Sequence, residues 1–244
     1  MLYVTGDLHG DETRLRRFSR GLRRRRDVLL VCGDFGFVWD GSEREKRVLS
    51  RLEKLDCTIF FVEGTHDNLD LLAACPRETV CGGPAGRAAK NIFWLQRGCL
   101  YQIEGRSVFA LGGAQSTDAD ERVEGVSWWR NELPTSEELA FAEETFRRAG
   151  RADIIITHQS PCAALGRIED CPDSTNPQKV FLARLAKSAD YGHWYFGGDH
   201  LDRPVSPRMT AVFEKILPVP ENFFAAQEKD SFRHTKKAGT AAGE

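Results

Sequence analysis

Short apolar runs alternate with longer amphipathic stretches through the first third of the chain. They predict strand 2–6, helix 11–26, strand 27–33, helix 42–55 and strand 57–63. Strands separated by helices in this rhythm pair in parallel, and the helices cover the sheet. The apolar character of residues 28–32 and 58–62 is typical of strands that are buried on both faces.

The pattern changes in the middle of the chain. Residues 91–113 hold short apolar runs separated by Arg97-Gly98 and Glu104-Gly105, which are turn signals and predict antiparallel pairing. Residues 114–134 are polar and irregular, and we interpret them as a loop. The remaining segments predict helix 135–149, strand 153–158, helix 176–188, strand 193–197 and a hairpin strand at 209–217.

Length and composition indicate one α/β domain, which we place at 1–220 of the 244 residues. The polar segment 221–244 lacks an apolar period, and we predict it to be disordered. The net charge of −2 does not indicate a general polyanion binder, and no apolar stretch approaches the roughly 20 residues of a membrane span. Seven scattered cysteines and the lack of a leader before Gly6 favour reduced thiols and a cytoplasmic location.

Histidines and aspartates recur directly after predicted strands. They lie in Asp7-Leu8-His9-Gly10, Gly33-Asp34, Gly64-Thr65-His66-Asp67, Thr157-His158 and Gly197-Gly198-Asp199-His200. Because loops gather at the carboxyl ends of parallel strands, we expect these side chains to meet there. Imidazole and carboxylate ligands suit Mn²⁺, which we favour, or Fe or Zn, and a carboxylate can bridge two ions about 3.5–4 Å apart. The sequence therefore predicts a site for one or two divalent metal ions.

The same five segments, in this order over residues 7–200, resemble the DxHG, GD, GNHD/E, H and GHxH motifs of the calcineurin-like metallophosphoesterases. A closer likeness to small bacterial members of that superfamily lies in Gly112-Gly113-Ala114, Ser127-Trp128-Trp129, Trp194-Tyr195-Phe196-Gly197 and Met209-Thr210-Ala211-Val212-Phe213. The resemblance implies an α/β fold, a four-layer αββα sandwich of two mixed β-sheets flanked by helices. Phe37 stands where the protein-phosphatase branch has an aspartate, which argues against that branch.

The resemblance also implies ligands for two ions. The first ion would bind to Asp7, His9, Asp34 and His200, with Asp34 as the bridge. The second ion would share Asp34 and add His158, but two further ligands are missing. Thr65 stands in place of the family's asparagine and is a possible ligand only through its hydroxyl, a poor neutral one. Gly198 stands in place of a histidine and offers no side chain.

Three interpretations of the second site remain open. The second ion binds weakly, with water or the substrate phosphate in place of the missing ligands. Alternatively, Asp199, or less favourably His193, serves as a replacement ligand. In the third interpretation the protein holds one ion or none.

By resemblance, the function is metal-dependent hydrolysis of a phosphomonoester or phosphodiester, such as a small phosphate ester or a nucleotide. A metal-bound hydroxide attacks phosphorus, Asp34 is catalytic through the metal, and His66 matches the family position that protonates the leaving group. We expect loop 114–134 to act as a lid, with Asp118, Arg122 and Trp128-Trp129 as candidates to contact the substrate. A surface ion pair and plain packing are the respective alternatives.

Two other functions compete with hydrolysis. Thr65 and Gly198 favour a weak or inactive family member that binds a phosphorylated ligand, a nucleic acid or a protein partner without turnover. Residues 14–26 contain eight arginines and no acid, around an apolar face of Leu15, Phe18 and Leu22. They form either a solvated helix face or a surface that binds nucleic acid through its phosphates.

Overall fold

The computed structural model describes residues 1–22, 27–161 and 175–221. The tail predicted to be disordered lies outside these residues except for its first position, and so do the four arginines at 23–26. No helix in the described ranges is both long and apolar enough to cross a bilayer. The cysteines in these ranges are free thiols, and the cytoplasmic location stays a prediction.

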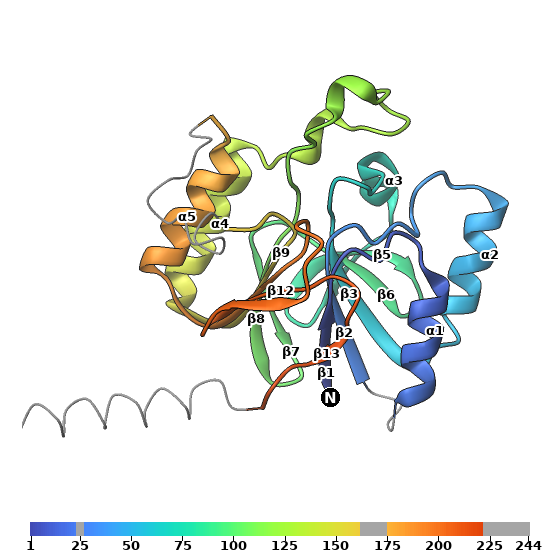
Figure 1. Cartoon of the computed structure of the whole chain (residues 1–244), viewed down its shortest axis with the longest axis horizontal. Coiled ribbons are helices and arrows are strands. Elements are labelled where there is room, and N and C mark those ends of the chain that lie inside the picture. The colour runs from blue at the N-terminus through green and yellow to red at the C-terminus, as the bar shows by residue number, and fades with distance from the viewer. Residues whose placement is uncertain (23–26, 162–174, 222–244) are drawn as a thin grey trace, which may run out of the picture.

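Two mixed sheets lie face to face at the centre of the molecule (Figure 1). The first sheet has the strand order β13-β1-β2-β3-β6-β5-β4, with bounds Leu217–Pro218, Leu2–Thr5, Asp27–Cys32, Cys57–Val62, Ile92–Leu95, Gly83–Ala89 and Arg77–Val80. The second has the order β11-β12-β10-β9-β8-β7, with bounds Arg203–Ser206, Met209–Ala211, Asp190–Phe196, Arg151–Thr157, Arg106–Leu111 and Cys99–Ile103. In the first sheet, β1 pairs in parallel with β2, and β2 with β3. In the second sheet, β8 pairs in parallel with β9, and β9 with β10.

Helices cover the outer face of each sheet. The first sheet carries α1 (Glu12–Gly21), α2 (Glu43–Leu52) and α3 (Leu69–Ala74), and the second carries α4 (Ser136–Ala149) and α5 (Pro177–Ser188) (Figure 1). Alternate residues of one strand pack on opposite faces. On β2, Leu30 packs between the sheets while Leu29 packs on the helix side. On β9, Ile154 packs between the sheets and Ile155 packs on the side of α4 and α5. The predicted αββα sandwich is therefore confirmed.

A buried ion network fastens loop 114–134 to the sandwich. The carboxylate of Glu63, which follows β3, is fully buried and accepts a hydrogen bond from Arg97 Nε. Arg97 also contacts Glu138 at the start of α4 at 3.0 Å, and donates to the backbone carbonyls of Asn131 and Glu132. Arg97 thereby connects the first sheet, α4 and the end of the loop.

The structure corrects two predicted elements. The helix predicted over 11–26 ends at Gly21, because Leu22 has an extended backbone (φ −70°, ψ 138°). The predicted strand at 209–217 is divided between the sheets. Its first part, β12, forms a hairpin with β11 in the second sheet, and the chain then crosses so that β13 pairs with β1 in the first.

Other differences lie between residues 69 and 113. The antiparallel pairing predicted there is present between β7 and β8, whereas β6 joins the first sheet parallel to β3. The sequence did not predict α3, β4 or β5. Strand β5 reads GPAGRAA, which has little intrinsic β propensity, so its pairing with β4 and β6 determines its conformation.

Candidate metal centre

The residues singled out by the motifs lie at the carboxyl ends of β1, β2, β3, β9 and β10. Glycines allow the close approach of these loops. A Cβ on Gly33 would lie within 2.5 Å of three atoms of the His158 side chain, and one on Gly64 would lie 2.1 Å from Asp34 Oδ1. Backbone bonds from His9 N to Asp34 O (2.8 Å) and from Gly10 N to Phe35 O (3.1 Å) join the first two loops.

Four of these residues share a backbone conformation that is uncommon outside glycine. Asp7, His9, Asp34 and His200 have φ values of 38°, 46°, 48° and 51°. Such conformations in non-glycine residues are typical of functional sites, where the surrounding structure holds a backbone that would otherwise be unfavourable. The surrounding structure therefore holds the backbone of the four residues that the resemblance assigned to the first ion.

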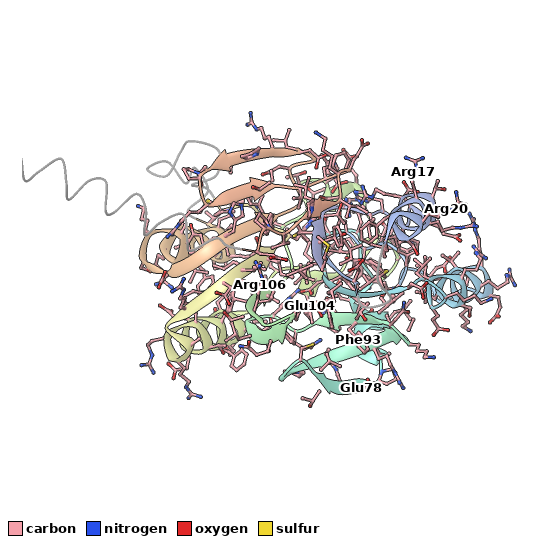
Figure 2. All side chains as sticks on the ribbon, turned by 90° about the horizontal axis from the view of Figure 1, so that it is seen from below. Arg17, Arg20, Glu78, Phe93, Glu104 and Arg106 are labelled. Atoms are coloured by element: carbon pink, nitrogen blue, oxygen red, sulfur yellow. The ribbon has the colours of Figure 1, made fainter. Side chains whose placement is uncertain are left out.

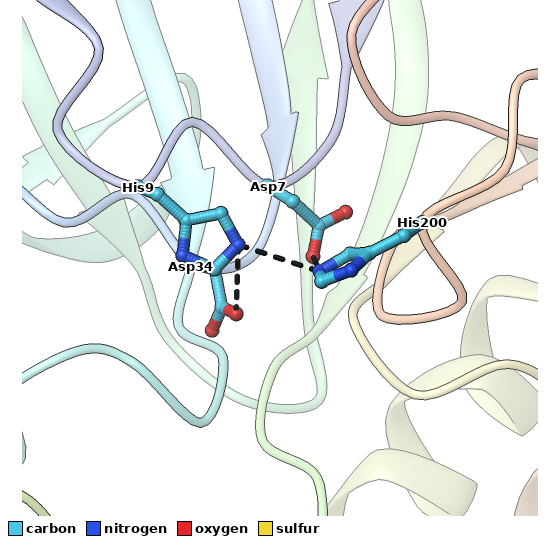
Figure 3. Close-up of side chains that lie close together, drawn as sticks. All are labelled: Asp7, His9, Asp34 and His200. Carbon is cyan, nitrogen blue, oxygen red and sulfur yellow. Dashed lines mark hydrogen bonds and ion pairs between the residues drawn. The ribbon is translucent and has the colours of Figure 1, made fainter.

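The four side chains converge (Figure 3). The metal-ligating atoms of Asp7, His9, Asp34 and His200 all lie within 4.8 Å of one another. His9 Nε2 is 3.4 Å from His200 Nε2 and 3.6 Å from Asp34 Oδ2, and His200 Nε2 is 3.7 Å from Asp7 Oδ1. Bonds of about 2.1 Å to one ion would place its ligands at most about 4.2 Å apart, so small shifts close this cluster. The predicted first site therefore fits a divalent ion.

Burial and charge set the protonation of the carboxylates. Burial raises the pKa of Asp7 to about 6, although His158 opposes the rise. Burial alone would also raise the pKa of Asp34, but the charge of His158 and the hydrogen bonds from His66 outweigh it and hold that pKa well below its usual range. Burial lowers the pKa of His9 more than Asp34 raises it. Asp34 is therefore ionised at neutral pH and His9 is neutral, which is the state a metal ion requires.

The second site is incomplete in the structure as well. His158 is buried, and its Nδ1 lies 3.0 Å from Cys32 O, which leaves Nε2, 3.5 Å from Asp34 Oδ1, to bind an ion. Gly198 contributes no side chain, and Thr65 Oγ1 lies 3.2 Å from His66 Nδ1. Among the described residues, Asp7, His9, Asp34 and His200 are the only such group of three or more convergent ligands. The residues present do not fit a second ion.

The two replacement ligands differ in position. Asp199 lines the same cavity as His158, and its Oδ1 accepts a hydrogen bond from Ser160 Oγ at 3.3 Å. It does not complete a ligand cluster with Asp34 and His158. His193 bonds to Thr210 Oγ1 at 2.8 Å, and burial, with the charge of Arg208, lowers its pKa to about 4. His193 is on β10 and does not line this cavity, so the structure gives no support to it as a ligand.

His66 lies between Asp34 and Arg122. Its Nδ1 is 2.9 Å from Asp34 Oδ2, and Arg122 Nη2 is 2.9 Å from its Nε2. Since arginine only donates, Nε2 accepts and the ring proton resides on Nδ1, where it is donated to Asp34. Arg122 is held in turn by Asp118, with Nε 2.9 Å from Oδ1. Both predicted substrate-contacting residues therefore face the site, and their ion pair is present too.

Loop 114–134 rises above the carboxyl ends of the strands (Figure 1). Trp129 is buried, its Nε1 donates to Asp70 Oδ2 at 3.1 Å, and its ring contacts Trp39 edge to face. These contacts make Trp129 a packing residue that anchors the loop above α3. Trp128 is half-buried and does not line the cavity beside Asp34.

Two residues of this region were not predicted to act at the site. Asp67 is buried and accepts hydrogen bonds from the backbone N–H groups of Phe35, Gly36 and Gly64, so it fixes the loops after β2 and β3. The place of Asp67 at the end of the Gly64–Asp67 motif was the sequence signal that could have indicated a role at the site. Lys179, in the first turn of α5, lines the cavity beside Asp34, and nothing in its sequence context indicated this.

Two of the four arginines in the described part of the basic stretch have structural partners. Arg14 donates to Gly6 O at 2.6 Å and Phe213 O at 3.1 Å, and Arg16 pairs with Glu12. Figure 2 shows Arg17 and Arg20 pointing outward from α1. The described part of the basic stretch therefore matches the solvated-helix interpretation, and nothing in it supports nucleic-acid binding.

The sequence profile described as Calcineurin-like phosphoesterase matches residues 1–205. The chain belongs to this family. No curated protein matches it. Among solved structures, a candidate 5′-nucleotidase from Staphylococcus aureus in complex with alpha-ketoglutarate is 12% identical with a TM-score of 0.49, and the match covers 90% of this chain and 51% of that one. This calcineurin-like phosphoesterase thus spans about half the length of that protein.

Proposed function

We propose that the protein hydrolyses a phosphomonoester or phosphodiester with the help of a divalent metal ion. The observation that carries this proposal is the convergence of Asp7, His9, Asp34 and His200 at the carboxyl ends of parallel strands, in a chain that belongs to a phosphoesterase family. Both carboxylates are buried while both imidazoles are partly exposed, so the cluster has one open side for a substrate.

The ion would be held by Asp7, His9, Asp34 and His200, and Mn²⁺ is our first choice because the ligands mix imidazole and carboxylate. When bound, such an ion lowers the pKa of water toward about 7 and neutralises charge on the phosphate. The protein keeps Asp7 oriented through the backbone N–H of Gly198, 3.1 Å from both carboxylate oxygens. Asp34 is oriented by the backbone N–H of His66 at 2.8 Å.

His66 is the candidate general acid. Its Nδ1–H is donated to Asp34, and Nε2 faces Arg122. Nε2 is an acceptor in this arrangement, so it can protonate the leaving oxygen only after Arg122 has turned away and Nε2 has taken up a proton from solvent, with Asp34 stabilising the resulting imidazolium at Nδ1. A phosphate at the site offers Arg122 a better acceptor, so substrate binding would free Nε2 for proton transfer, a contribution of about 10²–10⁴-fold in such reactions.

Three cavities adjoin the four ligands, and two of them also contain His66. One, of about 440 Å³, is lined by Asp34, His66, Arg122 and His158 and suits the phosphate. The other, of about 430 Å³, shares His66 and is walled by Phe37 and Trp39, so it could take an apolar part of the ester. A small phosphate ester or a nucleotide fits this arrangement better than a polymer, because each of these two cavities, at about 430–440 Å³, has the size of a small-molecule site.

A second function is favoured by one observation. Thr65 and Gly198 leave the second ion with only Asp34 and His158 of its four expected ligands, so a member that binds a phosphorylated ligand without turnover is the alternative. Hydrolysis of an aryl phosphomonoester and an aryl phosphodiester by metal-stripped protein resupplied with Mn²⁺ separates the two. We expect turnover that requires Mn²⁺ and disappears in Asp34→Asn. Turnover no greater than that of the folded Asp34→Asn control would leave the binding role.

A further inference from the structure

The cavity beside Asp34 and His158 is where a second ion would lie in this family, and cationic side chains line its other walls. Arg122 reaches it from loop 114–134, and Lys179 reaches it from the first turn of α5. Loop 114–134 and α5 are separate elements of the chain, and neither Arg122 nor Lys179 belongs to the five motifs. The cavity therefore places two cationic side chains around a site that keeps only Asp34 and His158 of the ligands expected for a second ion.

The contacts of Arg122 fix the position of its guanidinium group at the cavity, as phosphate binding requires. Its side chain is only 12% exposed, although it is on a loop. Nε contacts Asp118, Nη1 contacts Thr65 O at 3.0 Å and Ser127 O at 3.4 Å, and Nη2 contacts His66 Nε2 at 2.9 Å. These bonds use four of the five N–H groups of a guanidinium, which leaves one on Nη2 for a ligand in the cavity.

Lys179 and Asp199 line the same cavity. The backbone N–H of Lys179 donates to the Asn176 side chain at 3.0 Å, which fixes the first turn of α5. Asp199 Oδ2 is buried without a hydrogen-bond partner among the described residues. Since Lys179 and Asp199 line one cavity, a phosphate bound there would meet the ammonium group of Lys179.

Gly198, which stands in place of the family's histidine, has a left-handed backbone close to His158. Gly198 has a φ of +75°, and a Cβ there would lie 3.0 Å from His158 O and 3.5 Å from His158 Nε2. A side chain at this position would therefore start beside His158, as a second-ion ligand must. The glycine leaves that space to the substrate.

We infer that this protein is a one-metal phosphoesterase in which Arg122, with Lys179 in the same cavity, supplies the positive charge that a second ion gives in two-metal sites. The inference rests on the proposed function for its substrate, a phosphate ester. Arg122 can donate to the phosphate through the free N–H of Nη2, and through the second Nη2 N–H once it leaves His66 Nε2, and its guanidinium stays charged at any physiological pH. One ion on Asp7, His9, Asp34 and His200 and one guanidinium would then hold the phosphate from two sides.

The number of bound ions is the first test. Stripped protein would be titrated with Mn²⁺ by calorimetry, and the metal content would be measured by mass spectrometry after desalting. We expect one Mn²⁺ per chain in the wild type and one in Arg122→Gln. Two tightly bound ions per wild-type chain would overturn the inference and leave the proposed function intact.

Phosphate affinity is the second test. Calorimetry with inorganic phosphate on Mn²⁺-loaded protein should show about 10- to 100-fold weaker binding for Arg122→Gln, the range for one charge-assisted hydrogen bond to a charged group. Lys179→Met, on a separate element, should show a smaller loss. Arg20→Gln, an exposed arginine of α1, is the matched control and should bind as the wild type does.

The outcomes separate the two proposals. Phosphate affinity within about twofold of the wild type in both Arg122→Gln and Lys179→Met would overturn the inference, whatever the activity. One Mn²⁺ per chain with arginine-dependent phosphate binding, but no ester hydrolysis, would keep the one-metal phosphate site and reject the enzyme. Circular dichroism of each variant shows whether it has folded.

Discussion

At the scale of single residues, the site is built from side chains whose protonation and placement are set by a few close neighbours. Asp34 is the centre of these contacts, since His9, His66 and His158 each lie within 3.6 Å of one of its oxygens. Removing or displacing this carboxylate should therefore affect metal binding, the orientation of His66 and the position of His158 together.

The pKa of Asp7 makes metal affinity depend on pH. Burial raises it from the usual 3.8 to about 6, so the folded, metal-free protein keeps this proton up to about pH 6. The stability that protonated Asp7 gives the metal-free protein is present below pH 3.8 and is lost as the pH rises through about 6. Mn²⁺ needs the ionised form, so its affinity should fall about tenfold per pH unit below this pKa. Titrations at several pH values check this, and an unchanged affinity down to pH 5 would contradict it.

The glycine before Thr65 should not tolerate a side chain. In Gly64→Ala the new Cβ would lie 2.1 Å from Asp34 Oδ1 and 2.8 Å from His158 Nε2, both buried and unable to move away easily. We expect a loss of about 1–3 kcal/mol in the free energy of unfolding, with weaker Mn²⁺ binding. Gly21→Ala is the control, because a Cβ there meets no atom within 4 Å. Chemical denaturation and Mn²⁺ titration measure both effects, and equal behaviour of the two variants would rule out this account.

At the scale of elements, the helices and loops that follow the strands fix the positions of the site residues at the strand ends. Asn68 caps α3, Thr135 and Glu138 form a capping box on α4, and Asn176 caps α5. Glu138 also pairs with Arg97, so the start of α4 and the end of loop 114–134 depend on the same buried ion network.

Breaking that network should be costly. Arg97→Met would leave the fully buried carboxylate of Glu63 without its cationic partner, and the carbonyls of Asn131 and Glu132 without their donor. We expect the free energy of unfolding to fall by about 3–5 kcal/mol, as for other broken buried ion pairs. Arg147→Met, an exposed arginine of α4, should change it by less than about 0.5 kcal/mol. Urea denaturation of both variants decides, and a similar small effect in each would refute the role of Arg97.

At the scale of the whole molecule, the metal cluster joins the two sheets. Asp7 and Asp34 follow β1 and β2 of the first sheet, and His200 follows β10 of the second. The apolar layer between the sheets contains residues from both, including Leu30 and Ile154. An ion bound here would therefore stabilise the sandwich as one unit.

Metal should raise the stability of the entire domain. At 100 times its dissociation constant, Mn²⁺ should add about 2.7 kcal/mol to the free energy of unfolding, and near-ultraviolet and far-ultraviolet circular dichroism should report one common transition. Asp34→Asn should abolish the Mn²⁺ effect. Transitions that do not coincide in the two signals would show a populated intermediate and contradict unfolding of the domain as one unit.

The sequence by itself determined the parts of this protein that follow from local pattern. Periodicity placed β1, β2, β3, α2 and α4 close to their observed bounds, because their apolar spacing matches the geometry of the element. The motif order also indicated the first metal cluster, since parallel strands bring their carboxyl ends to one edge regardless of the details between them.

Only the tertiary structure decided the features that depend on contacts between distant segments. It divided residues 209–217 between two sheets, made β5 a strand and placed Asp67 against the backbone N–H groups of the loops after β2 and β3. It also brought Arg122 and Lys179, 57 residues apart, to the place of a second ion. Spacing along the chain does not encode such meetings, because they result from the packing of whole layers.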